Sequence, residues 1–369
     1  MSITTAPAHP AGNNDPALTA ADRAVKRARV LDILSAAGRE SVLLTSHTAV
    51  SWYLDGGRVG ISLASEPVAA VLVTAGGDHL VTFNNEAPRL AAEEIPAGIT
   101  VHEVPWHGSL TDVAGWFGPG RPPATEAELA GELRLARRSL LPGELGRYRG
   151  LCRESAEILT DVLSLSTPHT TERQLAAALA QRVVAAGADP LVLLVNGESR
   201  VQHRHPLPTD APLGRRAMAV VCARRDGMIA NVTRWVRFDG GTGAELDAEA
   251  RIARVEADIF NATVPGASIS GVLAEIRLAY ARHGFGTGQW QHHHQGGPAG
   301  YAGRDPRATD AVSDTAALDQ PFTWNPSGPG VKIEDTVLLT ASGICPLSVD
   351  SRWPASEVNG ILRPVTLQL

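Results

Sequence analysis

The sequence predicts a protein of mixed α/β class that is built from two domains. Its 369 residues are 44% hydrophobic and 20% charged, which is enough apolar material for a large core and for more than one domain. Helical and strand-like segments are interleaved along the chain, and the composition shifts at the Pro- and Gly-rich stretch "FGPGRPPATEAELAG". We therefore expect a flexible tail at residues 1–20, an α/β domain at 21–135 and a second domain at 140–369.

The first domain begins with a predicted helix and continues as a series of strands. Apolar residues recur at helical spacing through "ADRAVKRARVLDILSAAGRE", and Gly38 is a typical helix stop. The tetrapeptide "AGGD" indicates a hairpin turn between two strands. Short apolar runs predict strands at 41–46, 67–74, 79–83 and 98–106.

The second domain opens with two predicted helices, after which strands dominate. An amphipathic pattern spans residues 142–165, and a second helix is predicted over 170–188, where Thr171 and Gln174 have the spacing of a capping box. The dipeptide Asp226-Gly227 is a strong hairpin signal. Strands are predicted at 190–197, 217–224, 228–238 and 336–343, and a third helix at 264–284.

Charge, cysteine content and hydropathy narrow the range of partners and compartments. A net charge of −6 and a sequence pI of about 6.1 predict no nucleic-acid partner. No apolar run approaches the length of a membrane span, and the first residues lack the charged and apolar regions of a secretory signal. An odd, sparse set of three cysteines predicts no disulfide framework. We therefore expect a soluble, cytoplasmic protein that does not contact a membrane.

Three stretches, taken in chain order, carry a family resemblance. "LTSHTAVSWYLDGG" lies near the start of the first domain, "SLLPGELGRYRGLCRESAEIL" opens the second, and "FTWNPSGPGVKIEDTVLLTASG" lies near its end. In this order and at these separations the stretches resemble the pita-bread metallopeptidase family: methionine aminopeptidase, aminopeptidase P, prolidase and the metal-free creatinase. The resemblance implies a creatinase-type N-terminal α/β domain at 21–135 and a pita-bread catalytic domain at 140–369.

The resemblance also indicates where metal ligands would lie, and most of them are replaced. The family binds two divalent ions through two aspartates, one histidine and two glutamates, and the matching positions are Cys222, Asn231, His294, Asn325 and Glu334. The match at Cys222 is uncertain by a residue or two. Two dications need several carboxylates as oxygen ligands and for charge balance, so the sequence predicts no dinuclear centre and no metal cofactor. A single zinc on Cys222, His294 and Glu334 stays open as an alternative, because zinc accepts that ligand set.

The histidine run in "GQWQHHHQGGPAGYAGRD" looks at first like a metal site of its own. Because neighbouring residues of a strand point to opposite faces, His292 and His294 would share one side and His293 would not. We therefore interpret the run as one functional histidine, His294, with companions. The resemblance implies that His294 faces the pocket and that Tyr301 stands where the peptidases have a second histidine.

A histidine before the first ligand strand is the predicted proton-transfer group. His205 fits the resemblance to creatinase best, because Pro208 and Thr209 follow it at the right offset; His203 is the alternative. A histidine with a pKa near neutrality can give and take a proton within one cycle. Glu334 is expected to support it as the second half of an acid/base pair.

Arg58, in "SWYLDGGRVG", is the predicted carboxylate-binding residue. In creatinase an arginine after the corresponding loop reaches the neighbouring subunit's site and holds the substrate carboxylate, a role that suits a guanidinium. The resemblance thus implies a homodimer. The residues expected to contact a small-molecule substrate are Arg58, Tyr301, Asn231, Asn325, Cys222 and His203.

These expectations give a leading function and two alternatives. The leading one is a creatinase-like hydrolase or lyase without a dinuclear metal centre, in which His205, His294 and Glu334 cleave a C–N or similar bond in a small carboxylate-bearing substrate. The first alternative is a metal-dependent peptidase of the aminopeptidase P or prolidase type. The second is a non-catalytic pita-bread binding module, although the extra charged segments typical of such relatives are missing from this sequence.

Overall fold

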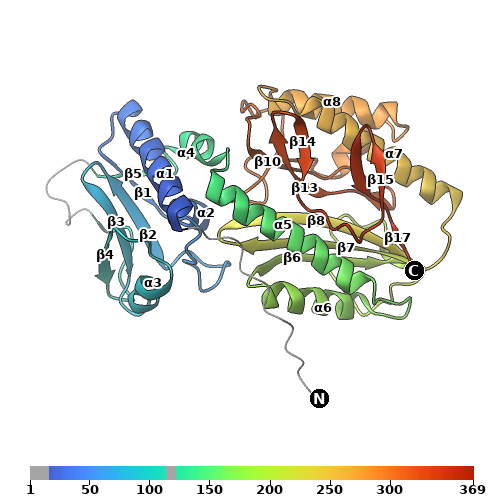
Figure 1. Cartoon of the computed structure of the whole chain (residues 1–369), viewed down its shortest axis with the longest axis horizontal. Coiled ribbons are helices and arrows are strands. Elements are labelled where there is room, and N and C mark those ends of the chain that lie inside the picture. The colour runs from blue at the N-terminus through green and yellow to red at the C-terminus, as the bar shows by residue number, and fades with distance from the viewer. Residues whose placement is uncertain (1–15, 114–121) are drawn as a thin grey trace, which may run out of the picture. The chain divides into compact units, whose positions relative to one another are not determined.

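The computed structural model describes residues 16–113 and 122–369, which form two compact units (Figure 1). The N-terminal unit comprises the described part of 16–144 with the turn 226–228, and the C-terminal unit comprises 145–225 and 229–369. The division falls within helix α5 (Pro142–Leu163), slightly beyond the boundary expected between 135 and 140. Helix α1 (Pro16–Ala36) begins inside the expected tail of residues 1–20, of which residues 1–15 lie outside the described part.

A five-stranded mixed sheet forms the centre of the N-terminal unit. Its order is β4-β3-β2-β1-β5, and the "AGGD" turn joins β2 to β3 as predicted. The buried Lys26 of α1 forms ion pairs with Asp55 and Glu144, so its charge is balanced inside the unit. The strands are β1 (Ser41–Leu44), β2 (Ala69–Thr74), β3 (Gly77–Phe83), β4 (Ile99–Val104) and β5 (Ala124–Thr125), and the shorter helices are α2 (His47–Tyr53), α3 (Ala87–Glu93) and α4 (Ala130–Arg137).

Two four-stranded sheets organise the C-terminal unit. One has the order β17-β8-β7-β6 and the other β14-β13-β10-β9. Helices α5 and α6 (Glu172–Ala185) accompany the first sheet, and α7 (Gly243–Ala262) and α8 (Ile269–Arg282) pack on the second (Figure 1). The strands of the first sheet are β6 (Asp189–Gly197), β7 (Arg216–Arg225), β8 (Met228–Arg237) and β17 (Leu367–Gln368), and those of the second are β9 (Gly296–Pro298), β10 (Gln320–Trp324), β13 (Asp335–Thr340) and β14 (Gly343–Pro346).

Shorter elements complete this unit. They are η1 (Glu198–Arg200), η2 (Gln289–His292), and the paired strands β11 (Ser327–Gly328) with β12 (Val331–Lys332) and β15 (Ala355–Val358) with β16 (Ile361–Pro364). Within the described part of the chain, no helix combines the length and the apolar character that a membrane crossing requires.

Local sequence signals explain most of these elements. The capping box of Thr171 and Gln174 starts α6 as predicted. Asp226 and Gly227 have φ values of 52° and 77°, which suits the tight turn predicted between β7 and β8. Helix α7 was not predicted, although Thr242 and Glu245 form a capping box at its start.

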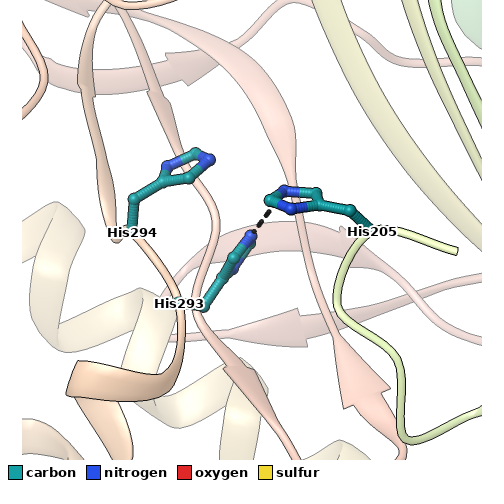
Figure 2. A group of neighbouring side chains, drawn as sticks. All are labelled: His205, His293 and His294. Atoms are coloured by element: carbon teal, nitrogen blue, oxygen red, sulfur yellow. Dashed lines mark hydrogen bonds between the residues drawn. The ribbon is translucent and has the colours of Figure 1, made fainter.

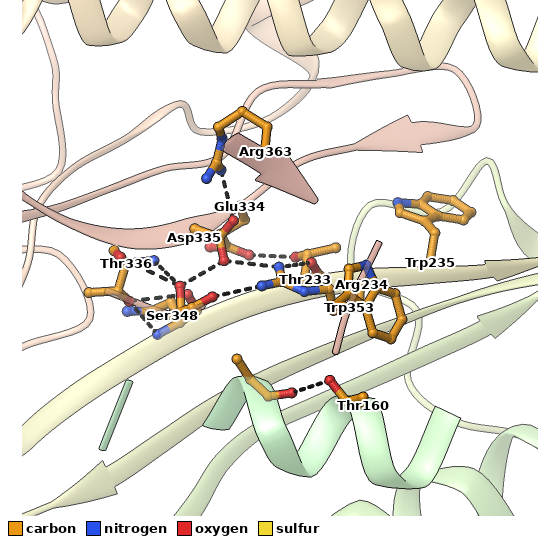
Figure 3. A network of polar contacts seen from close by, with 12 residues as sticks. Thr160, Thr233, Arg234, Trp235, Glu334, Asp335, Thr336, Ser348, Trp353 and Arg363 are labelled. Atoms are coloured by element: carbon orange, nitrogen blue, oxygen red, sulfur yellow. Dashed lines mark hydrogen bonds and ion pairs between the residues drawn. The ribbon is translucent and has the colours of Figure 1, made fainter. Parts of the chain in front are cut away.

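A buried ionic network ties β8, the start of β13 and the last strands together (Figure 3). Arg234 donates to Asp335 Oδ1 at 2.9 Å, and Ser348 Oγ donates to the same oxygen at 2.7 Å. Arg363 lies 2.7 Å from Asp335 Oδ2 and forms a two-point ion pair with Glu256 on α7. Each of these charges is buried, so each depends on its partners for compensation.

We expect Arg363→Met to destabilise the C-terminal unit by about 3–5 kcal/mol, because it leaves Glu256 and Asp335 buried with less positive charge. Denaturant unfolding followed by circular dichroism measures this. The matched control is Arg153→Met, which removes only an exposed helical pair with Glu157 and should cost less than about 1 kcal/mol. Equal losses in both variants would contradict the compensating role of Arg363.

Candidate functional site

Glu334 lies where β8 runs beside the chain between β12 and β13. The amide of Thr233 donates to Glu334 O at 2.9 Å, and the hydroxyl of Thr233 donates to Glu334 Oε2 at 2.8 Å. Consecutive residues of an extended chain point to opposite sides. Glu334 therefore has a set of partners separate from those of Asp335.

Two cationic side chains bind the carboxylate of Glu334. Arg304 Nη2 lies 2.7 Å from Oε1, and Lys332 Nζ lies 2.7 Å from Oε2. Burial alone would raise the pKa of Glu334, but the charges of Lys332 and Arg304 outweigh burial and hold that pKa well below its ordinary value. Glu334 is thus a buried carboxylate whose charge is balanced by the protein's own side chains.

Three histidine rings converge on one another (Figure 2), and the charge of Glu334 acts on each of them. His205 lies on the loop between η1 and β7, and His293 and His294 lie between η2 and β9. The Nε2 atoms of His205 and His293 are 3.2 Å apart, and Ser327 Oγ lies 3.2 Å from His293 Nδ1. One nitrogen of each ring lies within 4.8 Å of the other two, and we call these three residues the histidine cluster.

The histidine cluster is held in its neutral form at physiological pH. Burial and the charge of Lys332 lower the pKa of His293 to about 2, and burial and the charge of Arg304 lower that of His294 to about 4. The partial enclosure of the His205 ring, again with Lys332, lowers its pKa as well. Neutral imidazoles have a free nitrogen lone pair, so the cluster can accept protons or bind a metal ion.

The prediction that His293 points away from the site is wrong. Its side chain is buried and contacts both His205 and Ser327, whereas His292 is exposed. The alternation rule failed because η2 ends at His292 and only His293 begins an extended segment, so the run is not one regular strand. His203, the alternative to His205, is exposed and lies outside the histidine cluster.

The remaining positions matched to family ligands are placed as follows. Cys222 is on β7 beside Met218 and Val220, and burial together with the charge of Glu334 raises the pKa of its thiol to about 12. Asn231 is buried on β8 and donates to Ile229 O and Thr323 Oγ1, both at 3.4 Å. Its amide group therefore serves the packing of β8. The Oδ1 atom of Asn325 is buried and has no hydrogen-bond partner.

Tyr301 and Arg58 are the other two predicted substrate residues. Tyr301 is buried directly after Gly300, which pairs with Ile229 of β8. Arg58 belongs to the N-terminal unit, where its guanidinium binds Glu94 at 2.5 Å and Glu93 at 3.3 Å. A substrate carboxylate in a partner subunit's site would have to compete with Glu94 for the guanidinium of Arg58. The homodimer stays a prediction.

The described residues do not fit the two metal ions that the resemblance implies. Both carboxylate oxygens of Glu334 already bind cationic groups, and Cys222 offers a thiol where the family has a carboxylate. Asn231 and Asn325 bring no charge. The ligand atoms of Cys222, His294 and Glu334 do not converge on one point. Among the described residues, only the histidine cluster brings three such ligand atoms together. The single-zinc set considered from the sequence is therefore not the set that the fold brings together.

Several site residues were missed from the sequence. Lys332 and Arg304 bind Glu334, and Ser327 contacts His293. Lys332 had a detectable signal: it is one of two lysines in a chain with 33 basic residues, and it stands two positions before Glu334, on the same side of an extended segment. Arg304 and Ser327 had no such sequence signal, because long-range packing alone brings them to the site.

A separate cavity of about 670 Å³ lies between α7, the end of β8 and the β15–β16 hairpin. Its wall includes Trp235, Leu246 and an ion pair between Arg237 and Glu249, and it contains no member of the histidine cluster. It offers room for a ligand, but no histidine is among the residues that line it.

Comparison with known proteins places the fold. No family model matches this sequence, and no curated protein matches it. Among solved structures, prolidase from Pyrococcus horikoshii OT3 is similar with a TM-score of 0.73 and 17% identity, covering 89% of this chain and 99% of the prolidase. Dipeptidase PepE from Mycobacterium ulcerans has a TM-score of 0.72 and 17% identity, covering 96% of this chain and 99% of the dipeptidase.

A similar structure also comes from a protein that is not named as a peptidase. The N-terminal domain of FACT complex subunit SPT16 from chickpea (Cicer arietinum) has a TM-score of 0.64 and 10% identity, covering 89% of this chain and 97% of that domain. The chain therefore has the pita-bread fold with a preceding α/β domain, as predicted. At these identities the likeness establishes the fold alone, so function has to be argued from the site.

We expect Lys332 and Glu334 to be strongly coupled in a double-mutant cycle. Lys332→Met or Glu334→Gln alone leaves a buried charge poorly compensated and should cost about 3–5 kcal/mol of unfolding free energy. The double variant should cost clearly less than the sum of the two, as measured by denaturant unfolding. The exposed pair of Arg173 and Asp210 is the control, with an expected coupling below about 1 kcal/mol. Additive losses at Lys332 and Glu334 would contradict direct compensation.

Proposed function

We propose that this chain is a creatinase-like enzyme of the pita-bread fold that works without a dinuclear metal centre. In this proposal the histidine cluster transfers protons, and Glu334 fixes the charges around it. The reaction is cleavage of a C–N or similar bond, by hydrolysis or elimination, in a small substrate that bears a carboxylate.

The observation that carries the proposal is the pairing of Glu334 with Lys332 and Arg304. A carboxylate at this position in the family binds metal, whereas here each of its oxygens lies 2.7 Å from a cationic nitrogen of the protein. A side-chain cation balances the charge but cannot ionise a water molecule or polarise a carbonyl as a bound metal does. Proton transfer then falls to the neighbouring imidazoles.

The hydrogen bonds of the cluster suggest a route for the proton. The Nε2 atoms of His205 and His293 are 3.2 Å apart, a hydrogen-bond distance, so one proton is shared between them. With His293 Nδ1 donating to Ser327 Oγ, His293 Nε2 accepts from His205 Nε2, and Nδ1 of His205 keeps a free lone pair that can take a proton. This bond orients the ring of His205, the most exposed member of the cluster, as a fixed hydrogen-bond partner orients the histidine base of a serine-protease triad. His205 is the proposed acid/base, and His293 is a positioning residue.

The charges around the cluster favour an anionic substrate. The positive charges of Lys332, Arg304 and Arg307 act on the imidazoles, and so does the negative charge of Glu334. This excess of positive charge attracts a substrate carboxylate and repels a cationic group. His294 and the unpartnered Oδ1 of Asn325 are available to hydrogen-bond the reacting group, with His294 as the donor and Asn325 as the acceptor.

Substitution of the histidines tests this function. His205→Ala should lower kcat/KM about 10²- to 10⁴-fold with the circular dichroism spectrum unchanged, because it removes the acid/base. His293→Ala should lower kcat/KM as well, because His205 loses the partner that orients its ring. The matched control is His292→Ala, the exposed member of the same run, which should keep full activity.

The substrate for that assay comes from a screen of guanidino, N-acyl and N-alkyl amino acids at neutral pH. Near-normal turnover in His205→Ala would contradict the proposed acid/base. A screen with no turnover, together with binding of a protein ligand, would instead support the non-catalytic binding module.

Chelation separates this function from the metallopeptidase alternative. We expect activity to survive dialysis against EDTA and to gain nothing from added manganese, cobalt or zinc, because Glu334 and the replaced ligand positions cannot hold two ions. Elemental analysis of the protein purified without chelator is the companion measurement. Two equivalents of metal per chain, or restoration of lost activity by metal, would contradict the proposal and favour a peptidase.

A further inference from the structure

The histidine cluster has a second chemical capacity besides proton transfer. Three imidazoles, with no carboxylate or thiolate among them, present nitrogens that lie within 4.8 Å of one another (Figure 2). We propose that His205, His293 and His294 form a reversible site for one divalent transition-metal ion, and that the bound ion switches off proton transfer by the cluster.

The spacing of the nitrogens fits a single ion. In a tetrahedral site with metal–nitrogen bonds of about 2.0–2.1 Å, two ligand nitrogens lie about 3.3 Å apart. The Nε2 atoms of His205 and His293 are already 3.2 Å apart. The ring of His294 lies 4.5 Å from that of His293 and 5.8 Å from that of His205, centroid to centroid, so a small rotation brings its nitrogen into range.

The surroundings of two ligands leave room for that adjustment. His205 is exposed on a loop, and no hydrogen bond holds the buried Nδ1 of His294. Imidazole nitrogens select zinc, cobalt, nickel or copper over magnesium and calcium, which prefer oxygen. Three histidines leave a fourth position open toward the solvent that His205 reaches.

The surrounding charges determine which kind of ligand takes the fourth coordination position. Lys332, Arg304 and Arg307 repel a cation, and Glu334 attracts it but is already bound on both oxygens. A metal ion therefore binds best together with an anion, such as hydroxide or a carboxylate, that reduces the positive charge. This site differs from the dinuclear centre of the family in ligand type, in ion count and in the lack of carboxylate ligands.

The inference rests on the proposed function only for the consequence of binding. A metal ion on Nε2 of His205 and His293 takes the lone pair and displaces the proton that the acid/base needs. Metal binding should therefore inhibit the enzyme that is proposed above, and dissociation of the ion should restore it.

Cobalt(II) is the probe, because it absorbs strongly in the visible when it is four- or five-coordinate and weakly when it is octahedral. Titration of the metal-free full chain should reach one equivalent with intense absorbance. His205→Asn and His293→Ala should lose that signal, and His292→Ala should keep it. His205→Asn is the key variant, since an exposed loop substitution leaves the fold intact.

Absence of an intense band in the wild-type protein, or an unchanged band in His205→Asn, would overturn the metal site whatever the enzyme does. One-to-one binding with loss of turnover supports both the site and the proposed function. One-to-one binding with a gain of turnover keeps the site, overturns the switching role and shows that the metal-independent mechanism is wrong. The two claims can thus fail separately.

Discussion

The register of β8 against residues 334–336 decides which charges face the site. The amide of Thr233 donates to Glu334 O, and the amide of Asn231 donates to Thr336 Oγ1, which donates in turn to Asn231 O. These bonds fix Glu334 beside Lys332 and Arg304 and place Asp335 in the arginine network. A slip by one residue would exchange the two carboxylates between these sets of partners.

That register gives the two buried carboxylates, Asp335 and Glu334, different surroundings. Asp335 is enclosed by Arg234, Arg363 and Ser348, and its surroundings belong to the packing of α7 and the last strands. Glu334 is bound by Lys332, Arg304 and the hydroxyl of Thr233, and its charge acts on the three imidazoles nearby. Because burying any ion costs several kcal/mol before compensation, neither carboxylate can be removed without rearranging its partners. The charge pattern of the site is therefore part of the stability of the unit.

The fold could be predicted from the sequence better than the site could. Local signals such as the Asp226-Gly227 turn, the Thr171 cap and the apolar runs of β6 to β8 depend on short stretches, and the structure confirms them. Helix α7 was missed because its polar, alanine-rich start hides the apolar stripe that Ile252, Ile259 and Phe260 bury.

The site depends on contacts that span long distances in the sequence. His205 and His293 are 88 residues apart, and the distance between them follows from how the loop before β7 packs beside the chain after η2. Motif matching found His205, His294 and Glu334 one at a time. It gave His293 the wrong role, because a rule for regular strands was applied where a short helix ends.

Similarity of fold does not show which chemistry these side-chain contacts allow. Prolidase, dipeptidase PepE and the SPT16 domain share this architecture at 10–17% identity with the chain, so the architecture accepts very different sequences. In this chain, cationic side chains of the protein occupy the oxygens of Glu334, and three histidines converge nearby. Positive charge fixed on side chains cannot act as a Lewis acid, so in the proposed function imidazole nitrogen takes the place of metal-bound water. The same lone pairs that make imidazole a base also make it a ligand, and competition between a proton and a metal ion for those lone pairs is a direct physical consequence of the arrangement.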